Sequence, residues 1–300
     1  MYDVIIVGGS AAGLSAALVL GRFRRRVLIC DHQKPRNAPA AAAHNVFTRD
    51  GTPPAELLQI GREQLRPYPT VEYRSAEVVS LVATENGFDV QTADGTVWHS
   101  RRVLLATGVR DEFPDIPGLA DYWGKGGVHH CPYCDGWEVR DQKVVLIGSG
   151  TVVAHLAPLL ASLTSDMTAC LVGKEPIPEE LATLNQFGVA LYQDGIKSIE
   201  GSAGHVTGVR LPDGRFIPCQ AIFVGTKPKQ HSSLAHEVGC KFDDHGYVKV
   251  DELGRTSVPN VYAAGDMASP FHQVMAAAAS GLAAASGVNT DIVFGAPRDS

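Results

Sequence analysis

The chain opens on a short stretch that predicts its fold: VIIVGGSAAG, residues 4–13. Four aliphatic residues lead into a glycine turn and then into small residues, the pattern of a buried parallel strand that enters a helix. Gly8 and Gly13 take the first and last places of a G-x-G-x-x-G motif, and Ser10 takes the middle place. A small residue in that place lets the backbone approach a phosphate at the helix N-terminus. The stretch therefore predicts a dinucleotide-binding turn.

A carboxylate follows close to the spacing that this motif requires. The next predicted strand, RVLICD at residues 26–31, ends on Asp31. A carboxylate at this place accepts hydrogen bonds from ribose hydroxyl groups. With the strand, the helix and Asp31 in register, dinucleotide binding is favoured over a tight turn that binds no ligand.

The same pattern occurs a second time, in KVVLIGSGTVVAHLAPLLASL at residues 143–163. The stretch 106–127 between the two copies is rich in proline and glycine, which suits a crossing between domains. Near the end, VYAAGDMASPFHQ at residues 261–273 predicts a strand, a turn at Gly265 and Asp266, and a helix from about Gln273. We therefore predict an α/β fold of two Rossmann-like domains, the second inserted into the discontinuous first. The predicted limits are 1–115 and 245–300 for the first domain and 116–244 for the second.

Composition narrows the class of protein. The 300 residues are 45% hydrophobic and 19% charged, which is a globular composition. A formal charge of −6 argues against a nucleic-acid binder, whose surface would be basic. The first apolar run is long enough to span a membrane, but Asp3 precedes it and a Gly-Gly-Ser break interrupts it. It also lacks the preceding basic residues and the cleavage pattern of a signal peptide. Six cysteines and no visible targeting sequence lead us to expect the reducing cytoplasm and no membrane partner.

Two of the six cysteines, Cys131 and Cys134, lie in GVHHCPYCDGWE at residues 127–138. A zinc site would need His129 and His130 as further ligands, but adjacent side chains point apart and the chain has no second CxxC, so we predict no metal. A permanent structural disulfide across so small a loop would remove little chain entropy. A redox dithiol is the favoured interpretation, with Asp135 placed to relay a proton. The other four cysteines are isolated, and we expect buried, small apolar side chains there.

Four motifs follow one another across nearly the whole chain, in the order VIIVGGSAAG, LLATGVR, CPYCDG and TSVPNVYAAGD. In this order and spacing the chain resembles the low-molecular-weight thioredoxin reductase family of flavoproteins. The resemblance implies tight, noncovalent FAD in the first domain and a nicotinamide-type second domain that carries the dithiol. It also implies that electrons pass between the flavin, the dithiol and a thioredoxin-like protein or a small disulfide or dithiol, and that the chain forms a homodimer.

The resemblance also assigns roles to single residues. Cys134 would lie nearer the flavin, Cys131 would attack the partner's disulfide, and Asp135 would act as the acid–base group. His44 and His272 have no counterpart in the family, and we expect ordinary surface or core histidines at both positions. The positions that fall on the family's FAD site are Gly8, Ser10, Gly13, Asp31, Asn45, Thr107, Gly108, Asp266 and Gln273.

The second glycine turn departs from the family. Its predicted helix carries Pro158, which we expect to remove a backbone donor within the early turns. After the next strand the family has a His-Arg-Arg cluster that binds the 2′-phosphate of NADPH, whereas this chain has Lys174 followed by Glu175, Glu179 and Glu180. Because carboxylates repel a phosphate, we predict poor or absent use of NADPH. NADH through Glu175, or an empty domain, are the other possibilities at this site.

Without NADPH, two enzyme classes remain open. In one, another donor such as a reduced protein supplies the flavin, and the dithiol reduces a disulfide. In the other, the enzyme oxidises dithiols to disulfides and passes the electrons to oxygen, as some flavoproteins that resemble this family do. Those relatives often carry a histidine directly after the CxxC. This chain has Asp135 there, which favours the reductase direction.

Overall fold

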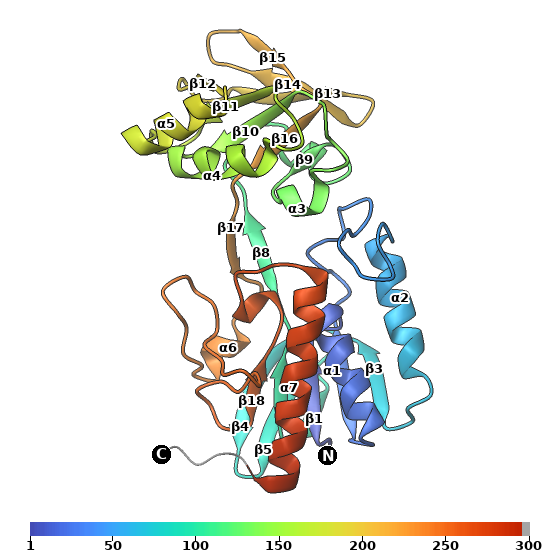
Figure 1. Cartoon of the computed structure of the whole chain (residues 1–300). Helices are drawn as coiled ribbons and strands as arrows, with labels where there is room; N and C mark the ends of the chain where they lie inside the picture. The colour runs from blue at the N-terminus through green and yellow to red at the C-terminus, as the bar shows by residue number, and fades with distance from the viewer. Residues whose placement is uncertain (296–300) are drawn as a thin grey trace. The chain divides into compact units, whose positions relative to one another are not determined.

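The computed structural model describes residues 1–295, which form two compact units (Figure 1). Unit 1 comprises Met1–Ala38, Asn45–Arg110 and the chain from Pro228 onward, and unit 2 comprises Pro39–His44 and Asp111–Lys227. Both units are α/β and contain a parallel sheet, so the predicted fold of two Rossmann-like domains is confirmed. The second domain is inserted into the first, as the two glycine turns indicated.

The chain returns from the large segment of unit 2 to unit 1 at residues 227/228, whereas the sequence placed this limit at 244/245. Leu234, Ala235 and Cys240 explain the difference, because all three are buried in the core of unit 1. The short segment Pro39–His44 belongs to unit 2, which no sequence pattern indicated.

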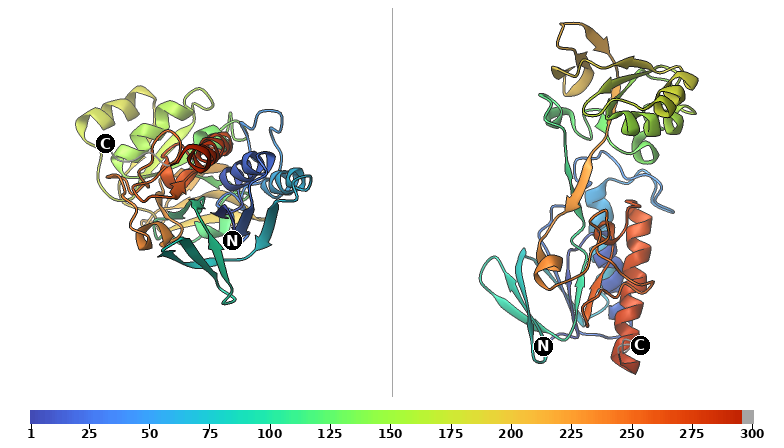
Figure 2. Two further views of the ribbon diagram at one scale, coloured as in Figure 1. Left: turned by 90° about the horizontal axis from the view of Figure 1, so that it is seen from below. Right: turned by 90° about the vertical axis from the view of Figure 1, so that its left-hand side faces the viewer.

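Unit 1 is built in three layers (Figures 1 and 2). Its parallel sheet has the order β18-β7-β1-β2-β3. Ile6 and the small side chains of α1 and α7, such as Ala16 and Ala284, form the core on one face of this sheet. Ile5 and residues of the antiparallel sheet β4-β5-β6, such as Phe88, form the core on the other face. Alternate residues of one buried strand thus serve two different cores.

The elements of unit 1 are β1 (Val4–Val7), α1 (Ala11–Arg22), β2 (Val27–Asp31), α2 (Pro54–Leu65), β3 (Val71–Ser75), β4 (Val78–Thr84), β5 (Gly87–Thr92), β6 (Val97–Ser100), β7 (Val103–Leu105), α6 (Leu234–Glu237), β18 (Val261–Ala263), the 3-10 turn Asp266–Ala268 and α7 (Val274–Phe294). Strands β8 (Val109–Glu112) and β17 (Lys227–Gln230) pair with each other and carry the crossings at 110/111 and 227/228.

Unit 2 repeats this plan around the parallel sheet β12-β11-β10-β16-β9. Leu146 packs with α4 and α5 on one face, whereas Ile147 packs with the antiparallel sheet β13-β14-β15 on the other. The elements of unit 2 are the 3-10 turn Ala120–Tyr122, β9 (Val128–His129), α3 (Pro132–Asp135), β10 (Val144–Gly148), α4 (Gly150–Leu160), β11 (Met167–Leu171), α5 (Pro178–Gln186), β12 (Ala190–Tyr192), β13 (Ser198–Ser202), β14 (His205–Arg210), β15 (Phe216–Pro218) and β16 (Ala221–Val224).

The expectation for Pro158 is wrong in its position. Pro158 lies near the C-terminal end of α4, so it does not disturb the early turns. The helix continues to Leu160, because a missing donor so close to the end costs only one intrahelical hydrogen bond. Among residues 1–295, no helix has both the length and the apolar character needed to cross a membrane.

A buried ion pair fixes α7 to the rest of unit 1. The Asp291 carboxylate accepts hydrogen bonds from Arg255 Nε (2.8 Å) and Nη2 (2.7 Å) and from the Tyr262 hydroxyl (2.6 Å). Burial by itself raises the pKa of Asp291, but the bonds from Arg255 and Tyr262 outweigh it and lower the pKa below its ordinary value. A carboxyl whose pKa falls on folding stabilises the protein above its unfolded pKa, and this contribution is lost as the pH falls through the folded pKa.

We expect Asp291→Asn to lower the free energy of unfolding at neutral pH by about 3 kcal/mol, because Arg255 keeps its charge and loses a buried partner. Urea unfolding measures this change. Asp251→Asn is the matched control, since Asp251 also pairs with Arg255 (3.0 Å) but is half exposed, and it should cost less than about 1 kcal/mol. If the two variants lost the same free energy of unfolding, the larger contribution assigned to the buried Asp291 would be contradicted.

Candidate redox and cofactor sites

The first glycine turn is packed too tightly for side chains at two positions. Gly8 has φ 107°, and a Cβ atom there would collide with the carbonyl oxygen of Ala106. A Cβ atom on Gly13 would collide with the carbonyl oxygen of Gly8. Helix α1 therefore starts directly above β1, as a turn that holds a pyrophosphate requires.

The donors of this turn are available to a ligand. Ser10 is the N-cap residue of α1 and makes no side-chain capping hydrogen bond. Within residues 1–295, the backbone N–H groups of Gly9 and Ser10 donate to no protein acceptor. Free N–H groups at the start of a twelve-residue helix suit an anionic ligand.

Asp31 is held as a fixed acceptor at the end of β2. It is buried, and its Oδ2 accepts a hydrogen bond from the Tyr73 hydroxyl at 2.6 Å while its Oδ1 accepts one from the Gln33 N–H at 3.1 Å. Burial and the bond to Asp31 raise the pKa of Tyr73 to about 12, so Tyr73 stays a donor at neutral pH. The sequence did not indicate Tyr73, because this residue lies on β3 and reaches Asp31 only through the pairing of β2 with β3.

Sheet order brings the remaining predicted residues to one edge. Gly8, Thr107 and Asp266 follow β1, β7 and β18, which are neighbours in the sheet of unit 1. The carboxyl ends of parallel strands lie at the same edge, where α/β proteins bind their ligands. Gly108 has φ 66°, so the chain turns there as predicted. Gln273 is the N-cap residue of α7, as expected.

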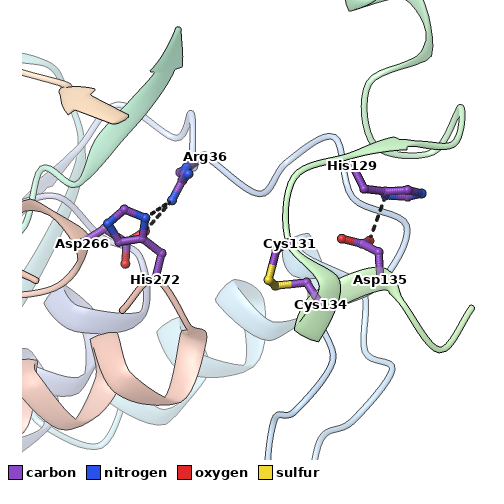
Figure 3. Close-up of a disulfide and its surroundings, with 7 residues drawn as sticks. All are labelled: Arg36, His129, Cys131, Cys134, Asp135, Asp266 and His272. Atoms are coloured by element: carbon purple, nitrogen blue, oxygen red, sulfur yellow. Dashed lines mark hydrogen bonds and ion pairs between the residues drawn. A yellow bond between two sulfur atoms is a disulfide. The ribbon is translucent and has the colours of Figure 1, made fainter. Parts of the chain in front are cut away.

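Arg36 and His272 join this group, although the sequence did not indicate them as a pair. Arg36 Nη1 donates to His272 Nδ1 at 2.8 Å and lies 3.3 Å from Asp266 Oδ2 (Figure 3). Because a guanidinium only donates, His272 Nδ1 carries no proton in this contact. Asn45 lies in the exposed segment between β2 and α2, where its N–H donates to Asp50 Oδ1 at 2.7 Å.

The CxxC of unit 2 forms a disulfide between Cys131 and Cys134 (Figure 3). Cys131 is the N-cap residue of the single-turn helix α3, and its carbonyl oxygen accepts the N–H groups of Cys134 (3.1 Å) and Asp135 (3.2 Å). Pro132 at the first helical position has no N–H to satisfy and favours this turn. The turn thus holds the two Cα atoms 5.3 Å apart, a distance at which the disulfide closes.

A histidine lies beside this turn. His129 Nδ1, at the end of β9, is 3.2 Å from Asp135 Oδ1 (Figure 3). His130 instead stacks on Trp123, with ring centroids 5.5 Å apart, so the two adjacent histidines have different partners. A carboxylate bound to Nδ1 keeps the proton there and leaves Nε2 as the basic nitrogen. The local sequence did not indicate this pairing.

The other cysteines are buried, as predicted. Burial raises the pKa of Cys30, Cys170 and Cys219 to about 12 and also raises the pKa of Cys240. These thiols stay protonated at neutral pH and are poor nucleophiles. Reactivity is therefore concentrated at Cys131 and Cys134.

Two nucleotide-type units in one chain, with a disulfide-forming CxxC on the second, define the class of disulfide oxidoreductases. Residues 2–281 match the family described as pyridine nucleotide-disulphide oxidoreductase, and the chain belongs to this family. It is an oxidoreductase of the thioredoxin reductase-like type, and its cofactor is FAD, as in the other flavoproteins of the family.

Relatives match over almost the full length. The chain is 32% identical to thioredoxin reductase sirT of Leptosphaeria maculans, over 96% of this chain and 94% of the relative. It is 32% identical to the solved putative thioredoxin reductase TrxB of Bacillus anthracis, with a TM-score of 0.93 and coverage of 98% and 99% of the two chains. A solved oxidoreductase of Agrobacterium tumefaciens is 33% identical, with a TM-score of 0.91 and the same coverage.

Proposed function

We propose that this flavoprotein exchanges its Cys131–Cys134 disulfide with the dithiol or disulfide of a thioredoxin-like protein or a small molecule. The observation that carries the proposal is the disulfide itself, closed across one turn by two half-exposed cysteines. The names of the relatives, which are thioredoxin reductases, support a thioredoxin-like partner. Homodimer formation and a cytoplasmic location stay predictions from the sequence.

Unit 1 is the proposed FAD domain, and its free donors and fixed carboxylates fit the cofactor. The N–H groups of Gly9 and Ser10 would hold the pyrophosphate, and Asp31 would bind the ribose hydroxyls. Asp266, held by Arg36, would bind the ribityl chain, and Thr107, Gly108 and Gln273 would line the remaining length together with Asn45. When bound, FAD supplies a group that takes up or releases an electron pair.

The exchange step follows from the chemistry of the turn. A thiolate of the partner attacks one sulfur of the disulfide, the S–S bond breaks, and the other cysteine leaves as a thiolate. The partner's second thiol then attacks the mixed disulfide, so that the partner becomes a disulfide and Cys131 and Cys134 become a dithiol. Two protons pass from the partner to the enzyme thiols. Asp135, paired with His129, is the proposed group that relays them.

Anaerobic stopped-flow mixing tests this function. Oxidised holoenzyme is mixed separately with a dithiol such as dithiothreitol and with NADPH, while the visible absorbance of the flavin is followed. We expect the dithiol to reduce the flavin within seconds, so that its visible absorbance falls. NADPH should leave the flavin oxidised and its absorbance unchanged. A flavin that stays oxidised with every dithiol, including reduced thioredoxin, would refute the exchange.

Dithiol oxidation by oxygen is the second candidate function, and one observation favours it. His129 supplies an imidazole next to the CxxC, although Asp135 stands where oxygen-using relatives often carry their histidine. In this direction a dithiol and oxygen would give a disulfide and hydrogen peroxide. Fast return of the bleached flavin in air, with oxygen uptake equal to the dithiol consumed, would select this direction over disulfide reduction.

A further inference from the structure

The second glycine turn, in unit 2, is closed by the chain's own backbone. The Gly150 N–H, at the start of α4, donates to the carbonyl oxygen of Lys174 at 2.8 Å. Gly150 is buried, and a Cβ atom on it would collide with the backbone of Pro176. The segment from Lys174 to Pro176 therefore covers the position at which a Rossmann turn presents its N–H groups to a pyrophosphate.

A side chain fills the space beside this turn. A Cβ atom built on Gly148 would lie 2.6 Å from Val152 Cγ1, and one built on Gly225 would lie at the same distance from the same atom. Gly148 ends β10 and Gly225 follows β16, the neighbouring strand. Val152 thus packs onto both strand ends, at the edge of the sheet where a dinucleotide would cross from one strand to the next.

The first turn of the same chain provides the matched comparison. In register with the strands, Ser10 corresponds to Gly150 and Ala12 corresponds to Val152. The Ser10 N–H donates to no protein acceptor within residues 1–295, whereas the Gly150 N–H is taken by Lys174. The first turn thus keeps this donor for a ligand, whereas the second turn uses the corresponding donor, the Gly150 N–H, within the protein.

The charges around the second turn also disfavour the binding of a dinucleotide. Glu175 and Glu179 are exposed, and Glu180 caps α5 by accepting the Ile177 N–H at 2.9 Å. Lys174 is the single cation of residues 172–180. Two exposed carboxylates beside one lysine oppose the pyrophosphate of any dinucleotide, with or without a 2′-phosphate.

We propose that Val152 and the segment Lys174–Pro176 close the second nucleotide turn, so that unit 2 binds neither NADPH nor NADH. The disagreement with the family's nicotinamide cofactor is therefore steric as well as electrostatic, and it excludes the NADH alternative through Glu175. This inference deepens the proposed function and rests on it in one respect: reducing equivalents would enter through Cys131 and Cys134, from a dithiol.

Direct binding tests the closure independently of turnover. The holoenzyme, whose first turn is occupied by FAD, is titrated with NADPH and with NADH by isothermal calorimetry and by equilibrium dialysis. We expect no saturable binding of either nucleotide up to millimolar concentration. A dissociation constant below about 1 mM for either nucleotide would overturn the proposal. Dithiol-driven bleaching of the same preparation reports separately on the exchange function, so the two failures are distinguishable.

The assigned residues are tested by opening the turn. Val152→Ala removes the branch that packs on the two strand ends, and Pro176→Gly frees the backbone of the segment that covers Gly150, so that this segment can move away. This double variant is expected to bind NADH with a dissociation constant below about 0.1 mM, at least about 10-fold under the limit of about 1 mM set for the wild-type chain, with flavin content and dithiol exchange retained. Thr151→Ala is the matched control, because Thr151 is exposed in the same helical turn and is not among the atoms nearest to a Cβ built on Gly148 or Gly225. This variant should bind no nucleotide. A folded double variant that binds no better than the wild-type chain would refute the role of Val152 and Pro176.

Discussion

Cys131→Ser is expected to abolish dithiol–disulfide exchange, with a fall in turnover of at least about 10³-fold, as when a catalytic nucleophile is removed. Serine cannot form the disulfide that the wild-type chain closes between Cys131 and Cys134. The other thiols cannot replace it, because burial raises the pKa of Cys30, Cys170 and Cys219 to about 12. Turnover is measured with reduced or oxidised thioredoxin and, in parallel, with dithiothreitol.

The companion variant Cys134→Ser separates the roles of the two cysteines. If Cys131 attacks the partner, Cys134→Ser should accumulate a mixed disulfide with the partner that mass spectrometry detects, and Cys131→Ser should not. Cys240→Ala is the control, since it removes a buried thiol outside the turn and should change the rate by less than about 2-fold. If Cys131→Ser turned over at the wild-type rate, the CxxC would take no part in the reaction.

The sequence predicted features that depend on neighbouring residues. Gly8 and Gly13 lie a few residues apart on one strand and one helix, so their spacing alone indicated the turn. The same holds for Cys131 and Cys134, which one helical turn brings together. The burial of the other four cysteines was also predicted, because an isolated cysteine most often serves as a small apolar side chain.

Features that depend on contacts between distant segments could not be predicted. Tyr73 reaches Asp31 through strand pairing, and Arg36 meets His272 across a sequence separation of 236 residues. The closure of the second turn needs Val152, Pro176 and Gly225 from three segments. For the same reason the sequence indicated an electrostatic obstacle to NADPH but not the closure of the turn by the segment Lys174–Pro176.

The predicted limit of the inserted domain, 244/245, differs from the crossing at 227/228 for a related reason. Leu234 and Cys240 precede the predicted limit but are buried in the core of unit 1. Turns and prolines report on local chain geometry, whereas a domain boundary depends on which core takes up the apolar side chains.

Gly13→Ala is expected to yield protein without flavin, because the added Cβ atom would collide with the Gly8 carbonyl oxygen. That oxygen belongs to the backbone of the turn, so α1 has to move away from β1, and the free N–H groups above the turn move with it. The proposed FAD site in unit 1 depends on those donors rather than on a side chain. The ratio of visible flavin absorbance to protein, after reconstitution with excess FAD, measures the effect, and we expect it to fall at least about 10-fold.

Ser10→Ala is the matched control in the same turn. The Ser10 side chain makes no capping hydrogen bond, and alanine keeps the backbone N–H, so this variant should retain its flavin. Loss of flavin in Ser10→Ala would show that the hydroxyl binds the cofactor. To separate misfolding from loss of binding, the thermal midpoint of Gly13→Ala is compared with that of wild-type apoprotein. Gly13→Ala that purifies with a full complement of FAD would contradict the placement of the pyrophosphate at this turn, because the collision with the Gly8 carbonyl oxygen would then not displace the donors.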